Sequence, residues 1–351
     1  MKNIRTPQRA TAPFGLLVGI LGFASAAWAL DFTIDNVVAA HAFNVADLKS
    51  GTIEFSDHTG TGGVDAETAL IRFDEWTDKA PVEKKFLALF PSYTEPTVGK
   101  TVNGATKQIV EKLFMYVAQA RFLVDRAPGA IDLSRYVTLS FLDKIDPAIK
   151  HGSISAADPT QFKDEQTAGN DNPDRKRCTG RTTSICIQSI YQLEGKIPMG
   201  IMLVNKLRDS GRKVADHIDF QSEFSALAPA DLDQDGLRQL TSLDTPISSA
   251  LEQNIFYVNQ IMKFGKFFAA FQADPADANK TVVTAFMALA IKASVLDEKR
   301  GFETVPVLRN LVPAQVLMGQ SSFNSGDSIS AGLPKYARNE IKTVAGLLEV
   351  K

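Results

Sequence analysis

The chain has few of the residues that form dense cross-links or metal centres. Its 351 residues include only two cysteines, four histidines and two tryptophans. So few cysteines exclude a disulfide-dense scaffold, and the scattered histidines offer no zinc-binding pattern. The motifs His-Glu-x-x-His and Gly-x-Ser-x-Gly are both missing. No catalytic signature therefore points to an enzyme class.

The chain also has no large excess of charge of one sign and few long apolar runs. The formal net charge is −2, which argues against a general nucleic-acid binder because such proteins are basic. Beyond residue 29, no apolar run reaches the roughly 18 residues of a membrane-spanning helix. Lys263 and Lys266 interrupt one candidate run, and Lys292 ends another. We expect no nucleic-acid partner, and no transmembrane segment once the N-terminal signal described next is removed.

The first residues have the pattern of a cleavable export signal. Three basic residues precede an apolar stretch over 14–24, and an Ala-Trp-Ala tripeptide follows over 27–29. Small residues around a bulky one are what a signal peptidase recognises. We expect residues 1–29 to be removed and the mature chain to begin near Leu30, in the periplasm or outside the cell. The alternative is an N-terminal anchor that stays uncleaved.

The two cysteines lie at the end of a polar stretch over 152–186 that is rich in Ser, Thr, Asp, Asn and Gly. An even cysteine count in an exported chain predicts a disulfide between Cys178 and Cys186. The polar stretch fits either an insertion within one domain or a domain boundary. A basic cluster around Cys178 could bind phosphate, sulfate or an acidic glycan through its forked donors, although a solvated loop is the simpler interpretation. The cluster consists of Arg175, Lys176, Arg177 and Arg181.

Apolar residues at helical spacing dominate the rest of the chain. They predict a mainly α fold, a multi-helix globular bundle. The clearest expected helix covers 102–126, where apolar residues recur at steps of three and four. Further helices are expected over 82–90, 132–145, 200–207, 249–272, 280–296 and 335–350.

A minor β element is expected near the mature N-terminus. Apolar and polar residues alternate over 32–34 and again over 53–55. Residues 187–191 fit either a strand or a helix. We expect an N-terminal helical region over 30–151 and a C-terminal helical region over 187–351, either separate or together in one domain.

The sharpest local motif has three aspartates on alternate positions, followed by Gly236. This spacing is the front half of a calcium-binding loop, so Ca²⁺ is possible and no other cofactor is expected. Ser242 stands where such a loop needs a bidentate Glu, and Arg238 adds a positive charge. The competing interpretation is a helix that opens at Pro229, with acidic residues in its first turns. The candidate metal ligands are Asp231, Asp233 and Asp235.

These features predict a non-enzymatic binding or interaction module of the cell envelope, whose partner is an envelope component or a small ligand. The alternative is a hydrolase with an unrecognised active site. A cleft in which His41, His58, His151 or His217 meets a carboxylate and a serine would favour the enzyme. An apolar tunnel or a basic groove would favour binding. The aromatic stretch 255–271 is a candidate lining for an apolar cavity, although a plain core is the simpler interpretation.

Overall fold

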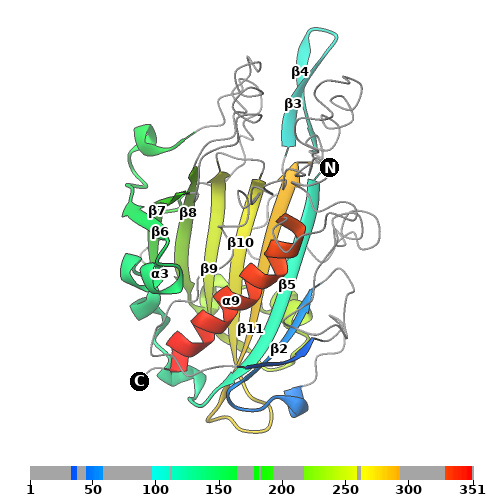
Figure 1. Cartoon of the computed structure of the whole chain (residues 1–351), viewed down its shortest axis with the longest axis vertical. Helices are drawn as coiled ribbons and strands as arrows, with labels where there is room; N and C mark the ends of the chain where they lie inside the picture. Colours follow the sequence, from blue (N-terminus) through cyan, green and yellow to red (C-terminus); the bar gives the residue numbers. More distant parts are fainter. Residues whose placement is uncertain are drawn as a thin grey trace, which may run out of the picture.

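The fold is built on one large β-sheet, crossed on one face by a long helix (Figure 1). The computed structural model describes residues 33–37, 45–57, 97–110, 113–163, 178–181, 183–192, 217–258, 262–292 and 329–349. The strand order in the sheet is β1-β2-β5-β11-β10-β9-β8-β7-β6. Strands β1 and β2 pair in parallel, and all other neighbours are antiparallel.

The strands of this sheet are short at its two edges and long at its centre. Their bounds are β1 (Thr33–Val37), β2 (Thr52–Asp57), β5 (Leu113–Val124), β6 (Ile149–Ser153), β7 (Ser184–Gln192), β8 (His217–Leu227), β9 (Ile247–Val258), β10 (Met262–Ala273) and β11 (Thr281–Lys292). A separate hairpin pairs β3 (Thr97–Val102) with β4 (Ala105–Val110).

The described helices are few. They are α3 (Leu139–Ile145), α5 (Gln234–Thr241) and α9 (Ile329–Glu349). Short 3₁₀ turns are η2 (Val45–Asp47), η3 (Pro128–Ala130), η4 (Leu133–Tyr136), η5 (Pro159–Gln161) and η6 (Pro229–Asp231). No helix in the described segments is both long enough and apolar enough to cross a membrane.

The predicted mainly α bundle is therefore wrong. Where helices were expected over 102–126, 249–272 and 280–296, the chain forms the end of β3 together with β4, β5, β9, β10 and β11. The cause is burial on both faces of the central strands. Such strands are almost continuously apolar, and a spacing of three or four can be picked out of any continuous apolar run.

Other expectations agree with the structure. The helix expected over 335–350 is α9, and the N-terminal β element consists of β1 and β2. The ambiguous stretch 187–191 lies in strand β7, and the helix expected over 132–145 is present only as η4 and α3. The helices expected over 82–90 and 200–207 fall outside the described residues, as does the signal over 1–29.

The two regions predicted to be helical contribute to the same sheet. Strand β5 of the first region pairs with β11 of the second along its whole length, from Leu113 opposite Lys292 to Val124 opposite Thr281. The segment between them, 152–186, contributes the end of β6 and the start of β7.

Helix α9 crosses one face of the sheet (Figure 1) and contributes five residues to the main core between them. The guanidinium of Arg126 donates to the carbonyl of Leu348 in the last turn of α9, where a positive charge complements the helix dipole. The guanidinium of Arg338 lies 5.5 Å from the ring centroid of Phe55 on β2, within cation–π range. The apolar stripe that packs on the sheet consists of Ala337, Ile341, Val344, Ala345 and Leu348.

The opposite face of the sheet is covered by α5 and by the polar stretch. Leu237 and Leu240 of α5 pack with Phe268 and Phe286 of the sheet in a second apolar cluster. Within the polar stretch, the ring of Phe162 packs edge-on against that of Phe256 on β9, with ring centroids 6.0 Å apart. Phe162 thus anchors this part of the polar stretch to the sheet.

Candidate ligand-binding site

A pocket opens between α9, α3 and the sheet face that α9 covers. Its cavity volume is about 90 Å³, which is room for several water molecules or a small ligand. Most of its lining is apolar, and five polar residues contribute to the rest. The apolar lining consists of Phe141, Leu142, Ile145, Ile149, Phe220, Phe224, Leu251, Ile255, Phe267, Met287 and Val344, and the polar lining of Asp146, His151, Gln253, Lys266 and Glu340.

Helix α3 forms one wall of the pocket, and a capping residue fixes where the helix begins. The hydroxyl of Thr138 accepts a hydrogen bond from the backbone N–H of Phe141 at 3.2 Å, which satisfies a free donor in the first turn. Phe141 and Leu142 are then buried toward the sheet. The ring of Phe141 stacks parallel on that of Phe224, with centroids 6.2 Å apart. This contact fixes the distance between α3 and β8.

The floor of the pocket comes from alternate residues of β9 and β10. Gly265 is paired directly with Ile255. A Cβ atom on residue 265 would lie 2.8 Å from Cδ1 of Ile255, closer than two such atoms approach. A glycine at this position therefore lets the Ile255 side chain lie over β10 and form part of the floor.

His151 lies on β6 at one side of the pocket and is fixed by a hydrogen bond. Its Nδ1 is 2.8 Å from the hydroxyl oxygen of Ser189, directly opposite on β7. Burial lowers the pKa of His151 below its ordinary 6.5, and the nearby charge of Asp143 opposes that shift. The imidazole therefore lines the pocket in its neutral form at neutral pH.

Two carboxyl groups, from Glu340 and Asp146, also line the pocket. Burial raises the pKa of Glu340 well above its ordinary 4.5, and the negative charge of Asp146 adds to the increase. Burial also raises the pKa of Asp146, although a hydrogen bond accepted from the backbone N–H of Ala148 at 3.0 Å partly offsets this. Within the described segments, no hydrogen-bond or ion-pair partner is found for the Glu340 carboxyl. The pocket thus holds two acidic groups whose ionisation burial disfavours, and Asp146 further disfavours that of Glu340.

Lys266 borders the pocket, but its ammonium is used elsewhere. Its Nζ lies 2.6 Å from Oε1 of Glu252, and the two side chains are almost completely buried. Both residues are on alternate positions that face away from α9, together with Phe268. The positive charge of Lys266 is therefore neutralised on the far side of the sheet.

The contact between His151 and Ser189 tests the alternative that the protein is a hydrolase. A histidine does meet a serine beside a pocket, and Asp143 is near enough to influence its charge. Ser189, however, is 0% exposed, and the lining of the pocket does not include it. A nucleophilic hydroxyl must reach its substrate. Of the other histidines, His217 begins β8, and His41 and His58 fall outside the described residues.

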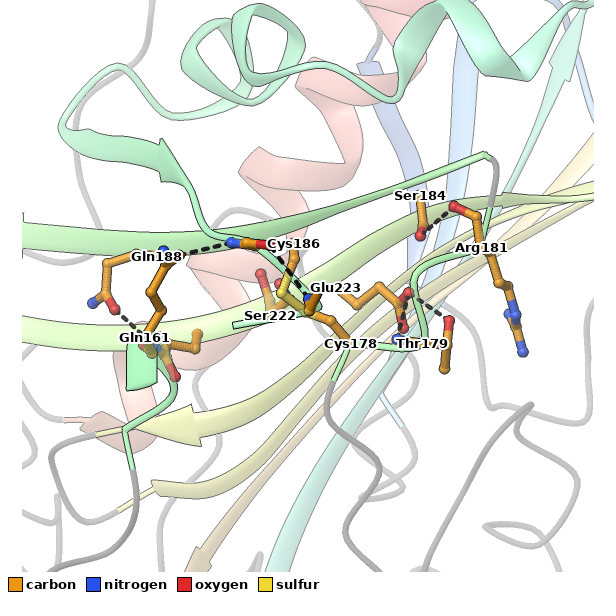
Figure 2. Close-up of a disulfide and its surroundings, with 12 residues drawn as sticks. Gln161, Cys178, Thr179, Arg181, Ser184, Cys186, Gln188, Ser222 and Glu223 are labelled. Carbon is orange, nitrogen blue, oxygen red and sulfur yellow. Dashed lines mark hydrogen bonds between the residues drawn. A yellow bond between two sulfur atoms is a disulfide. The ribbon is translucent and has the colours of Figure 1, made fainter. Parts of the chain in front are cut away.

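Cys178 and Cys186 form a disulfide, the pairing that the sequence predicts, with Cα atoms 5.7 Å apart (Figure 2). The bond joins β7 to the end of the polar stretch. The backbone N–H and the hydroxyl of Thr179 both donate to Oε1 of Glu223 on β8, at 3.0 and 2.6 Å (Figure 2). The disulfide thus holds this segment where Glu223 can accept both hydrogen bonds.

The predicted anion-binding cluster is only partly described. Arg175, Lys176 and Arg177 fall outside the described residues. The guanidinium of Arg181 lies 3.8 Å from Oε2 of Glu252, so this member is directed toward a carboxylate. Anion binding by the cluster stays a prediction.

The three aspartates of the calcium motif each have a local partner. Asp231 accepts from the backbone N–H of Ala228, Asp233 caps α5 by accepting from Gly236, and Asp235 pairs with Arg238. In the described segments, no group of three His, Cys, Asp or Glu side chains is placed to hold a metal ion. The structure does not bring the three carboxylates together, and calcium binding stays a prediction.

The residues of the pocket were not identified from the sequence. One signal for Glu340 was nevertheless present. It lies three residues after Ala337 and four before Val344, so it interrupts the apolar stripe of a helix that the sequence predicts correctly. An acidic residue on a buried helix face is rare unless it is paired. No comparable signal marks Asp146 or His151.

Comparisons with known proteins add no assignment. No protein-family model matches the chain, and no curated protein matches it significantly in sequence.

The disulfide is expected to contribute about 2.5 kcal/mol to the free energy of unfolding, because it closes a loop of about nine residues in the unfolded chain. Replacing both cysteines by serine should lower that free energy by this amount, measured by urea unfolding. The fold should survive, since the pair lies at the side of the sheet. A reducing agent should destabilise the wild type to the same extent and leave the double-serine protein unchanged. Equal stability of oxidised and reduced wild type would contradict the prediction.

Proposed function

We propose that the chain is an exported, non-enzymatic binding protein that takes a small amphipathic ligand into the pocket beneath α9. The observation that carries the proposal is the combination of a largely apolar cavity with polar groups gathered in it. Ligand sites in proteins have this composition: apolar walls supply affinity, and a few polar groups fix the orientation.

Export is supported by the disulfide between Cys178 and Cys186. Such bonds persist in oxidising compartments such as the bacterial periplasm and are rare in the cytosol. The export signal expected over 1–29 is consistent with this location. We propose a periplasmic or secreted protein.

Binding is favoured over hydrolysis by the environment of Ser189, the serine that contacts His151. The Ser189 hydroxyl is buried beneath His151 and fixes the orientation of the imidazole ring. In this role His151 offers its other ring nitrogen to a ligand as a hydrogen-bonding group. An apolar pocket with one hydrogen-bonding imidazole can bind and orient a ligand without catalysing a reaction.

The test uses the purified chain and the neutral fluorescent probe N-phenyl-1-naphthylamine, which brightens in apolar surroundings. We expect saturable binding of one probe per chain. Ile149 lines the pocket from β6, so Ile149→Trp should fill part of the cavity and weaken binding by at least about tenfold, roughly 1.4 kcal/mol. Thermal unfolding would show that the variant folds.

The matched control is Ile190→Trp on the neighbouring strand β7. Ile190 is 40% exposed, and it occupies a position of β7 that alternates with the buried Ile187 and Ser189. This variant should bind the probe like the wild type. Unsaturable binding, or equal weakening by both substitutions, would rule out the pocket as the binding site.

A further inference from the structure

We infer that the ligand of this pocket is an amphiphile whose polar end is a protonated amine. The inference rests on the proposed function and names the class of ligand. Its basis is the charge arrangement at the pocket, where Glu340 of α9 and Asp146, which follows α3, are the acidic groups.

The charged group shown to act on Glu340 is another acid, Asp146, and not a cation. From the α3 side it faces Asp146, with Asp143 further along the same helix near His151. From the sheet side the pocket offers His151, whose desolvation disfavours the cationic form, and Lys266, whose ammonium pairs with Glu252. On α9 itself, the guanidinium of Arg338 lies over the Phe55 ring of β2 and not beside Glu340. No cation of the described residues is therefore placed to neutralise both carboxyls.

An ammonium group would resolve this conflict. Burial raises the pKa of both carboxyls, and the negative charge of Asp146 raises that of Glu340 further, because negative charge is costly in an apolar site. A cation placed between them removes both the repulsion and part of the cost of burial, so Glu340 can release its proton to the buffer as the ligand binds. The neutral His151 can accept a hydrogen bond from the same ammonium, since an ammonium has three donors.

The alternatives suit the site less well. A carboxylate would add a third acidic group beside Glu340 and Asp146, and like charges at short range are repelled. An alcohol would accept a hydrogen bond from protonated Glu340 but would leave Asp146 without a counter-charge. The apolar walls from Phe141, Phe224 and Phe267 accommodate the body of any of the three equally. The polar end of the ligand is therefore what the pocket discriminates.

The experiment compares three ligands that share one eight-carbon chain: octylamine, octanol and octanoate. Each displaces N-phenyl-1-naphthylamine from the full chain at pH 7. Octylamine should bind at least about tenfold more tightly than octanol, and octanoate should bind most weakly. Calorimetry in two buffers of different ionisation enthalpy should show that octylamine binding releases protons and that octanol binding does not.

The decisive variant is Glu340→Gln, which keeps the shape of the side chain and removes its charge. It should abolish both the proton release and most of the preference for the amine, while binding of octanol is retained. Asp146→Asn is a second variant and should reduce the preference in the same way. The control, Asp235→Asn, removes a carboxylate that is 82% exposed on α5, and it should leave both readouts unchanged.

The outcomes separate the two proposals. If the fluorescent probe binds at the pocket but octylamine and octanol bind equally, or octanoate binds best, the amine inference is wrong and the binding function stands. If neither the probe nor any of the three ligands binds, both are wrong. A preference for the amine that survives in Glu340→Gln and Asp146→Asn would also overturn the inference.

Discussion

Replacing Lys266 by methionine is expected to lower the free energy of unfolding by about 3–5 kcal/mol, because it leaves a buried carboxylate without its counter-charge. Nζ of Lys266 lies 2.6 Å from Oε1 of Glu252, and the two side chains are 0% and 5% exposed. The guanidinium of Arg181, 3.8 Å from the other carboxylate oxygen, is too far to replace the lysine fully. The loss should therefore be large even though one cation remains nearby.

The double variant Lys266→Met/Glu252→Leu distinguishes loss of a pair from loss of packing. Apolar residues of similar size usually replace a buried ion pair at little cost. The double variant should therefore recover most of the stability lost in Lys266→Met. Urea unfolding of both single variants and of the double variant gives the coupling between the two residues directly.

A matched control is Lys280→Met, which removes the lysine of a solvent-exposed ion pair. Lys280 pairs with Asp125 at 3.3 Å, with side chains 36% and 51% exposed. Exposed pairs contribute about 0–1 kcal/mol, so this variant should change stability little. A loss in Lys266→Met no larger than that in Lys280→Met would show that the buried pair is not important to the fold.

Two charged residues of the central strands are buried, which a sequence pattern does not predict. Lysine at 266 and arginine at 121 sit in strands β10 and β5 and are almost fully buried. A sequence pattern treats charged residues as marks of a solvent-facing side. In this fold, both faces of the central strands are covered, so the charged positions face a second packed layer and not water.

The strand pattern was nonetheless present in β5. Ala120 and Phe122 face α9, and they alternate with Gln119, Arg121 and Leu123, which point to the other face of the sheet. This alternation is a period of two, as a strand requires. It was hidden because Val117 and Val124 extend the apolar run and also fit a helical spacing. Only the pairing with distant strands, such as β11, decides between the two periods, and such pairing is not a local property.

Helix α9 was predictable for the opposite reason. Its stripe at 337, 341, 344, 345 and 348 is separated by exposed or half-buried positions such as Asn339, so only one period fits. The pocket beneath it was not predictable. It is assembled from α3, β6, β8, β9, β10, β11 and α9, which are close only after the sheet has formed. A single sequence carries no information about which of these segments become neighbours.

The stability of the folded chain is expected to depend on pH through Glu340. The pKa of this carboxyl is raised in the folded state, whereas in the unfolded chain it is near 4.5. Between these two values the folded state binds the extra proton, so the free energy of unfolding falls as pH rises. Each unit of pKa difference corresponds to about 1.4 kcal/mol. Below pH 4.5 the group is protonated in both states and has no effect.

Other groups at the pocket titrate as well. The contribution of Glu340 is therefore read from the difference in unfolding free energy between the wild type and Glu340→Gln. Asp146 has a raised pKa and acts in the same direction as Glu340. His151 has a lowered pKa, so its contribution to stability is lost as pH falls below its unfolded value of 6.5. Subtracting the unfolding free energy of Glu340→Gln from that of the wild type removes the contribution of His151.

Glu340→Gln should therefore be as stable as the wild type near pH 4 and increasingly more stable as pH rises toward neutrality. Glutamine keeps the length of the side chain but needs no proton to remain neutral beside Asp146. The measurement is urea unfolding of both proteins at intervals between pH 4 and pH 8. Asp235→Asn, an exposed carboxylate on α5, should differ from the wild type by a small amount that does not increase with pH. A constant difference between Glu340→Gln and the wild type across this range would mean that the Glu340 carboxyl ionises in the folded protein as it does in water, and the acidic pocket would then carry a full charge that needs no ligand to neutralise it.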